Sequence, residues 1–249
     1  MQIITSVKKA LEILKLFHTA GPELTLTEIT GQMGLNKSSV YKLVTTMVES
    51  GFLEKDPLTN HYRLGLFVLE LSSKVVGSDD VRELARPVLE QLSRTTGEII
   101  HLSTLEGADI VYLEKVGQAQ PLTVATKIGG RAPAYCSAMG KVLLSGLSRA
   151  ELEKTVGPGP FEQYTPNTIT ELAVLEEELD RVRRQGYAID DEEAFPGIKC
   201  VAAPVRDREG RLIAAISATV PKQRMGPERT EELCKMITDA AEKITEKNV

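Results

Sequence analysis

Hydrophobic residues in the first fifty positions recur at the spacing of amphipathic helices. The pattern predicts a first helix that Ser6 caps and that ends at Gly21-Pro22, where turn residues interrupt the apolar stripe. Two shorter helices are predicted over residues 26–33 and 37–50, with Gly34 between them. Glycine tolerates the left-handed backbone conformation that a sharp turn requires.

Polar residues mark the starts of the two shorter helices. Thr25 and Glu28 have the spacing of a capping box, which satisfies amide donors that a helix start leaves without partners. Asn36 precedes the second helix as its predicted N-cap, and Gly51 ends that helix. Two short helices joined by a glycine turn predict a helix-turn-helix unit.

The second short helix has two distinct faces. One is an apolar stripe at helical spacing, made of Val40, Leu43, Val44 and Met47. The other carries short hydroxyls, one aromatic ring and two ammonium groups, and its predicted DNA contacts are Lys37, Ser38, Ser39, Tyr41, Lys42 and Thr45. Such a face suits a major groove, where small polar groups reach base edges and lysines meet phosphates. The alternative is an ordinary amphipathic helix with a solvated polar face.

The hydrophobic period changes from helix-like to strand-like after the second helix. Residues 52–55 and 61–64 flank a turn-rich segment and predict a β-hairpin. A hairpin directly after a recognition helix forms the wing of a winged helix-turn-helix, and we expect Asn60 and Arg63 to reach DNA. The alternative for Arg63 is a solvated strand residue.

A linker helix is predicted over residues 66–78, after Gly65. It carries an apolar side that has no partner within so small a winged domain, which spans residues 1–65. We therefore expect this side to pair with a second copy of the chain, giving a homodimer.

The remaining sequence, residues 79–249, mixes β-rich and helical runs and predicts one α+β domain with a mixed or antiparallel sheet. Asp79 or Asp80 is expected to cap a long helix that contains Pro87 and ends at Gly97. The further elements are expected in this order: strands at 99–105, 110–116 and 122–128, a helix from Ser137 to about Gly146, a short helix capped by Ser148, a helix starting at Thr168 or Thr170, strands at 200–205 and 212–220, and a helix over 227–247.

Composition and charge narrow the class of protein. The net charge is -5, but up to Gly77 eight basic residues face seven acidic ones, so the predicted DNA-binding part is near neutral. Aromatic residues make up only 4 % and Trp is absent, which disfavours stacking platforms for single-stranded nucleic acid. The three cysteines show no metal-ligand spacing and, without a signal peptide, fit a reducing cytoplasm. We expect no metal, no cofactor and no membrane span.

Several sequence blocks together resemble the IclR family of bacterial transcriptional regulators over nearly the whole chain. They are Ala10-Leu11-Glu12-Ile13-Leu14, residues 26–43, Ser137-Ala138-Met139-Gly140-Lys141, residues 184–193 and residues 197–205. The resemblance implies a winged helix-turn-helix, a linker helix and a GAF-like effector-binding domain. It also implies operator DNA and a small effector as partners, and homodimers that often pair into tetramers. Many relatives have His and Arg where this chain has Tyr41 and Lys42, which leaves the operator sequence open.

The resemblance also implies an effector pocket, whose positions in this chain are Ala138, Met139, Asp190, Cys200, Ser217 and Thr219. Backbone amides at a helix start and strand hydroxyls suit a small organic acid, whereas Asp190 would orient a hydroxyl, carry a proton or accept from an amide. The plain alternatives are a buried apolar role for Cys200 and core polar roles for the two hydroxyls. Glu192 and Glu193 are expected in a solvated loop.

Two other classes of function were weighed. A cysteine hydrolase would need Cys200, Asp190 and His101 in hydrogen-bond reach, because His18 and His61 lie in the predicted DNA-binding part. No motif surrounds His101, so we expect no enzyme. A pure interaction module would need no cationic face on the second helix, and the polar face of residues 37–42 argues against it.

Overall fold

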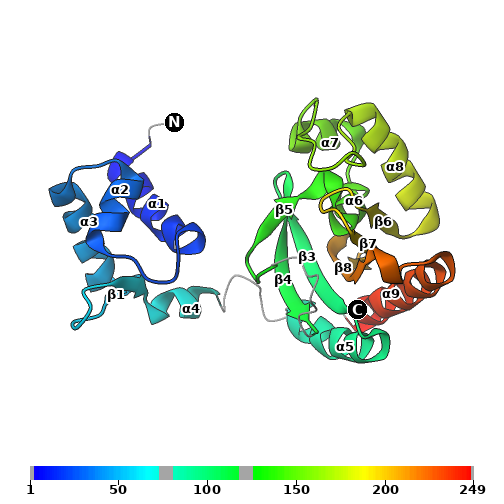
Figure 1. The fold of residues 1–249 in the computed structure, drawn as a ribbon, viewed down its shortest axis with the longest axis horizontal. Helices are drawn as coiled ribbons and strands as arrows, with labels where there is room; N and C mark the ends of the chain where they lie inside the picture. Colours follow the sequence, from blue (N-terminus) through cyan, green and yellow to red (C-terminus); the bar gives the residue numbers. More distant parts are fainter. Residues whose placement is uncertain (1–2, 73–80, 118–125, 248–249) are drawn as a thin grey trace. The chain divides into compact units, whose positions relative to one another are not determined.

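Local capping signals set the helix ends in the N-terminal unit of the computed structural model (Figure 1). The structure describes residues 3–72, 81–117 and 126–247, and these fall into two units that divide between residues 78 and 79. The N-terminal unit contains α1 (Thr5–Thr19), α2 (Leu26–Met33), α3 (Lys37–Glu49), β1 (Leu53–Lys55), β2 (Tyr62–Leu64) and α4 (Leu66–Ser72).

The predicted turn between α2 and α3 is confirmed in detail. Thr25 and Glu28 form the capping box, and Asn36 accepts a hydrogen bond from the Ser39 amide at 2.8 Å. Gly34 adopts a left-handed conformation with a φ of 61°, as the sharp turn requires. Ile29 of α2 and Val40 of α3 are fully buried between the helices, so the unit has a small core of its own.

The wing hairpin pairs Leu53 with Leu64 and Lys55 with Tyr62 in an antiparallel register. Asp56 shapes its tip, because its carboxylate accepts from two backbone amides of the turn. Behind the hairpin, a Cβ added to Gly65 would collide with a backbone carbonyl oxygen, so only glycine fits there.

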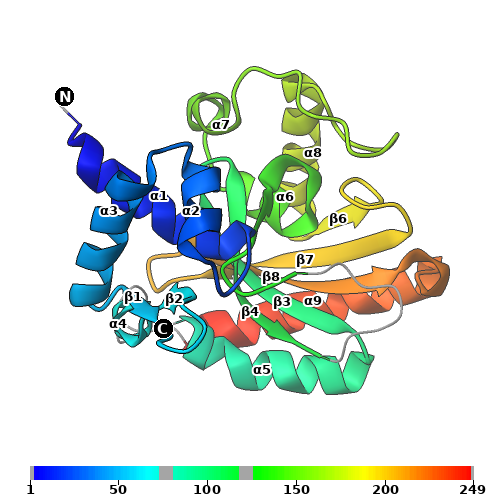
Figure 2. The ribbon, with the colours of Figure 1, turned by 60° about the vertical axis from the view of Figure 1, so that its left-hand side comes forward.

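The C-terminal unit is built on one six-stranded, fully antiparallel sheet in the order β5-β4-β3-β8-β7-β6. Helices α5 and α9 cover one face and α6 and α8 the other, as Figure 2 shows. Its elements are α5 (Val81–Thr96), β3 (Ile99–Glu106), β4 (Asp109–Val116), β5 (Arg131–Pro133), α6 (Ala138–Leu144), α7 (Arg149–Val156), α8 (Leu172–Gln185), β6 (Ala188–Asp191), β7 (Ile198–Arg206), β8 (Leu212–Pro221) and α9 (Pro227–Lys247), with short 3-10 turns at Ala134–Cys136 and Lys222–Arg224.

Alternate residues of the central strands face the two helical layers. On β8, Ile216 and Ala218 pack towards α5 and α9, whereas Ala215 packs towards α6 and α8. The small side chains let helices approach both faces closely. Ser217 is two residues after Ala215 on β8, so it also lies on the α6 face.

Some predicted boundaries were wrong or lie outside the described residues. Helix α1 begins at Thr5, one residue before Ser6, and its N-cap position makes no side-chain hydrogen bond. Helix α8 begins at Leu172, and its N-cap residue is Glu171. Thr168 does not cap the helix, because its hydroxyl accepts hydrogen bonds from the amides of Tyr164 and Thr165 in the preceding turn.

The predicted third strand of the second domain, residues 122–128, lies mostly outside the described residues. Residues 118–125 lie outside the described part, and residues 126–128 are not in a strand. Among the described residues, β4 pairs with β3 on one side and with the short β5 on the other. Only the first part of the predicted linker helix, up to Ser72, falls within the described residues.

Candidate DNA-binding face and effector cavity

The polar face of α3 is exposed, as the helix-turn-helix reading requires. Lys37, Ser38, Tyr41 and Lys42 are exposed, and Ser39 and Thr45 are partly exposed, whereas Val40, Val44 and Met47 are buried. The two lysines make no ion pair with another described residue, so their charge is available to an external partner. The helix start adds amide groups that favour anions such as phosphates.

Arg63 in the wing already has a protein partner. Its guanidinium contacts both carboxylate oxygens of Glu54 at 3.1 Å across the hairpin. Both side chains are about half exposed, and such pairs contribute only about 0.2–1 kcal/mol. Asn60 is exposed at the hairpin end with a φ of 59°. A phosphate would therefore compete with Glu54 for the Arg63 guanidinium. The pair between Glu54 and Arg63 was not predicted from the sequence.

All six predicted effector residues line one cavity of about 40 Å³ on the α6 face of the sheet. Its wall is completed by residues of β4, β5, β7 and the loops around them, namely Tyr112, Thr126, Ala132, Ser137, Ala194, Phe195 and Ile198. Strand pairing explains part of this convergence. Asp190 lies opposite Cys200, and Cys200 lies opposite Thr219, so three of the six form one cross-strand row.

Asp190 is buried at the cavity wall, with only 4 % of its surface exposed. Its carboxylate accepts from the backbone amide of Glu193 at 2.7 Å. Burial, followed by the negative charge of Glu193, raises the pKa of Asp190 to about 7. Near neutral pH this group therefore exists in both forms and can act as hydrogen-bond donor or acceptor.

Ser217 is 1 % exposed, and its hydroxyl has no hydrogen-bond partner among the described residues. A buried polar atom without a partner costs free energy, and such atoms often mark a site for a ligand or water. Among the described residues, the Ser217 hydroxyl therefore has no core hydrogen bond to satisfy.

Thr219 belongs to a hydrogen-bonded chain with Cys200 and His101. Its hydroxyl lies 3.6 Å from the Cys200 sulfur and 3.3 Å from Nδ1 of His101, whose Nε2 lies 2.8 Å from the Thr126 hydroxyl. Burial raises the pKa of the Cys200 thiol far above its usual range and lowers the pKa of His101 to about 3. A protonated thiol and a neutral imidazole that bonds to hydroxyls do not form an activated nucleophile, which argues against the hydrolase alternative.

The helix start at the cavity is weaker than expected as an anion site. Helix α6 has only seven residues, and the Gly140 amide already donates to the Ser137 hydroxyl at 3.1 Å. The amides of Ala138 and Met139 occupy the first helical positions, which have no intrahelical acceptor. They are donors for a ligand, with little help from a helix dipole.

Glu193 was wrongly expected in a solvated loop. It is buried, and its carboxylate contacts the buried ammonium group of Lys141 at 2.5 Å. The neighbouring Glu192 is partly exposed and pairs with Lys222. The burial of Lys141 was not predicted from the sequence, although a lysine in a short, otherwise apolar helix is unusual.

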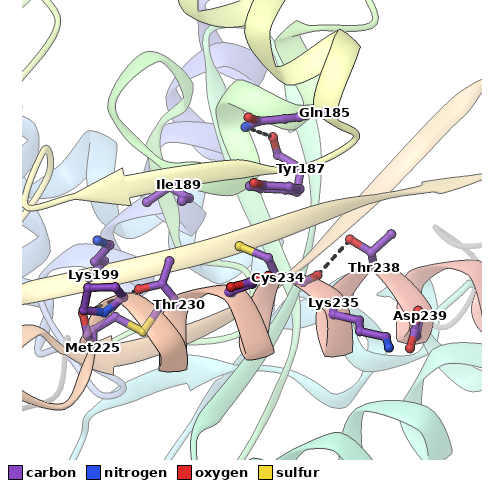
Figure 3. Close-up of a pocket in the computed structure, with 12 residues that line it drawn as sticks. Gln185, Tyr187, Ile189, Lys199, Met225, Thr230, Cys234, Lys235, Thr238 and Asp239 are labelled. Atoms are coloured by element: carbon purple, nitrogen blue, oxygen red, sulfur yellow. Dashed lines mark hydrogen bonds between the residues drawn. The ribbon is translucent and has the colours of Figure 1, made fainter.

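A larger hollow of about 650 Å³ lies elsewhere, between β6, β7 and α9 (Figure 3). It is an open groove, and several of its polar groups have partners within the protein. Thr230 and Thr238 bond to backbone carbonyls, and Lys199 pairs with Asp191. The smaller cavity differs from this groove because an unpartnered hydroxyl and a carboxyl with a raised pKa converge there.

The described ranges contain neither a membrane-spanning helix nor a metal-binding cluster. No helix there is long and apolar enough to cross a membrane. No group of three or more His, Cys, Asp or Glu residues has the arrangement needed to hold a metal ion.

Comparison with known proteins identifies the family. Residues 6–57 match the IclR helix-turn-helix domain, and residues 73–246 match the family described as bacterial transcriptional regulator IclR C-terminal. The chain is 40 % identical to the HTH-type transcriptional regulator XynR of Escherichia coli over 225 residues, which cover 90 % of this chain and 89 % of XynR. It is 35 % identical to KdgR of the same species, with 96 % and 92 % covered.

Solved structures agree with the sequence comparisons. The crystal structure of Thermotoga maritima IclR is 30 % identical, with a TM-score of 0.80 and 98 % of each chain covered. These relatives are transcriptional regulators, and they do not support the hydrolase alternative. The chain therefore belongs to the IclR family of bacterial transcriptional regulators.

Proposed function

We propose that this regulator binds operator DNA through residues 1–65 and a small organic acid through residues 79–249, with residues 66–78 as the linker helix between them. The observation that carries the proposal is the convergence of Asp190 and Ser217, with the four other expected residues, on one cavity. Such a regulator acts in the cytoplasm, where bacterial DNA is located.

The geometry of α3 supports insertion into a major groove. The exposed hydroxyls and the Tyr41 ring lie on the face opposite the buried Val40 and Val44. Lys37 and Lys42 flank this face and neutralise phosphates, while the shorter side chains approach base edges. Asn60 and Arg63 in the wing add contacts next to the groove.

The cavity chemistry supports an acid that is held by hydrogen bonds. No Lys or Arg side chain lines the cavity in the part of the chain that the structure describes. A carboxylate would instead accept from the hydroxyls of Ser217 and Thr219, the amides of Ala138 and Met139, and the protonated form of Asp190. The present volume holds a few water molecules at most, so the wall must move when an effector enters.

Exposed apolar side chains in the N-terminal unit support a homodimer. Leu66 and Leu69 of α4 are 75 % and 67 % exposed, and Val7 and Leu11 of α1 are 53 % and 54 % exposed. Apolar surface of this extent marks an interaction site. Replacing Leu66 and Leu69 by Gln should convert the dimer to monomer in sedimentation, whereas an unchanged dimer would place the interface elsewhere. The tetramer stays a prediction.

Effector binding controls DNA binding if the two ligands favour different arrangements of the dimer. The test is fluorescence anisotropy with DNA from upstream of the adjacent operon, with and without pyruvate, gluconate and benzoate. These probes represent keto, sugar and aromatic acids.

The decisive variant is Ser217→Ala, which removes the unpartnered hydroxyl at little structural cost. It should retain DNA affinity and weaken the response to the effective acid at least fivefold. The matched control, Ser145→Ala, removes a hydroxyl that bonds to a carbonyl of its own helix and should leave the response unchanged. A Ser217→Ala protein with an unaltered response would place the effector in another site.

A further inference from the structure

The buried ammonium group of Lys141 has three acceptors from three different segments. Its nitrogen lies 2.5 Å from the carbonyl oxygen of Ile189 in β6, 2.5 Å from a carboxylate oxygen of Glu193, and 3.3 Å from one of Glu178 in α8. Lys141 itself is 1 % exposed. A buried lysine costs several kcal/mol in lost hydration, so all three of its protons must be matched by acceptors.

Two of these acceptors lie directly beside residues that line the effector cavity. Ile189 precedes Asp190 on β6, and Glu193 lies in the β6–β7 loop, defined here as residues 192–197. The same loop supplies Ala194 and Phe195 to the cavity wall. Lys141 lies one helical turn after Ser137 on α6, the helix whose first residues, Ala138 and Met139, line the cavity. Its side chain thus connects two walls of the cavity.

The acidic residues around this loop differ in their partners. Asp191 pairs with Lys199 and Lys222, and Glu192 pairs with Lys222, in both cases at partly exposed positions. Glu193 pairs with Lys141 in the interior. Asp190 makes no ion pair with a described residue and bonds instead to the Glu193 amide. The position of Asp190 therefore depends on where Lys141 holds Glu193.

Lys141 contacts only one of the two carboxylate oxygens of Glu193. The second carboxylate oxygen of Glu193 is buried without a hydrogen-bond partner, which makes opening towards water less costly. The Thr168 hydroxyl donates to the Glu193 carbonyl at 2.6 Å and supports the loop from the other side. These contacts hold the β6–β7 loop in one position, and the unpartnered oxygen lowers the cost of opening it.

We propose that Lys141 is a positioning residue of the effector cavity: it holds the β6–β7 loop closed through Glu193 and so places Asp190 and Phe195 against the effector. This inference rests on the effector site proposed above. Replacing Lys141 should open the loop, expose the cavity and weaken the effector response without altering the DNA-binding face.

Cys200 provides a direct readout, because it lines the cavity together with residues of the loop. Labelling by N-ethylmaleimide requires access and a thiolate, and burial suppresses both while the loop is closed. Cys234 lies on α9, on the other face of the sheet and in the separate groove shown in Figure 3, and serves as an internal reference. Mass spectrometry of the full-length protein then gives the ratio of Cys200 to Cys234 labelling rates.

Two variants and one matched control test the proposal. Lys141→Met removes the charge at similar length and should raise the ratio at least tenfold. Glu193→Gln keeps the volume and one acceptor oxygen and should raise it severalfold, which keeps the test decisive if Lys141→Met does not fold. Glu192→Gln weakens the adjacent, partly exposed pair with Lys222 but keeps an oxygen that can accept from the Gly197 amide, so it should change the ratio less than twofold.

The outcomes separate a positioning role from a general structural one. A parallel rise of Cys200 and Cys234 labelling in Glu193→Gln, an unchanged ratio, or an equal effect of Glu192→Gln would overturn the proposal. Anisotropy with the same three acids completes the test, since opening without loss of the acid response would disconnect the loop from the effector. The labelling arm needs neither DNA nor effector, so its failure is distinguishable from failure of the proposed function.

Discussion

Lysine has opposite roles in the recognition helix and in the effector domain. Lys37 and Lys42 are exposed on α3 and make no ion pair with a described residue, whereas Lys141 is buried and has three acceptors. The first arrangement leaves charge available for phosphates, and the second uses charge to hold a wall in place. Burial and partners, and not residue type, decide whether a cation contacts a ligand or supports the site that does.

The two units also differ in how their stability is built. The N-terminal unit has a small core around Ile13, Ile29 and Val40, whereas the C-terminal sheet has separate clusters on both faces. A small core has less apolar burial to lose before it unfolds. The comparison therefore predicts that the DNA-binding unit is the less stable of the two.

The largest expected effect comes from removing a core side chain in either unit. Ile29→Ala should destabilise the N-terminal unit by about 2–5 kcal/mol and leave the other unit folded. Ile216→Ala, also fully buried, is the matched change in the C-terminal sheet. Calorimetry should show two transitions, each shifted by one variant. A single transition shifted by both would mean that the units unfold together.

A smaller effect is expected from the buried carboxyl of Asp190. Because its pKa is raised to about 7 in the folded state, folding retains a proton that the unfolded chain releases near pH 4. The stability that this proton contributes is therefore present below pH 4 and lost as the pH rises towards 7, at roughly 1 kcal/mol per pH unit. Asp190→Asn should remove this loss.

Urea unfolding of both proteins at pH 5 and pH 8 measures the difference. The Asn variant should gain stability relative to the original protein at pH 8. Parallel pH profiles would show that Asp190 is ionised throughout, and the cavity would then lack a proton donor for an acid.

Replacing either exposed lysine of α3 by alanine should weaken DNA affinity about eightfold. Lys42→Ala should weaken binding to all sequences at 0.1 M salt and reduce the slope of log affinity against log salt by roughly one unit. Lys154→Ala, an exposed lysine of α7, is the control and should change neither. An unchanged slope for Lys42→Ala would remove that residue from the DNA contacts.

The smallest effect is expected in the wing, where Glu54 occupies Arg63. Glu54→Gln should free the guanidinium and raise DNA affinity by about twofold, since the exposed pair contributes less than about 1 kcal/mol. Anisotropy at low salt measures this change. A fall in affinity would mean that Glu54 holds Arg63 in the orientation that DNA needs.

The sequence predicted the elements whose signals are local. Thr25, Gly34 and Asn36 define the helix-turn-helix within a dozen residues, and the structure confirms each of them. Ser6 and Thr168 show the limit of this reasoning, because a hydroxyl near a helix start has other backbone partners to choose from.

The cavity could be predicted only through the family resemblance. Its residues meet because β6, β7 and β8 pair in one register, and no local pattern specifies which strands become neighbours. Glu193 was assigned to solvent because its partner, Lys141, lies 52 residues away in the chain. Long-range pairs of this kind decide burial, and they become visible only in the folded protein.

The small volume of the effector cavity sets a limit on how fast the regulator can respond. A space of about 40 Å³ is smaller than a typical ligand site, so each binding event must wait for the protein to open. At high acid concentration the observed association rate then reaches a plateau at the opening rate and no longer follows collision frequency. Because loops of this kind open within microseconds to milliseconds, this plateau would limit the response only on those short times.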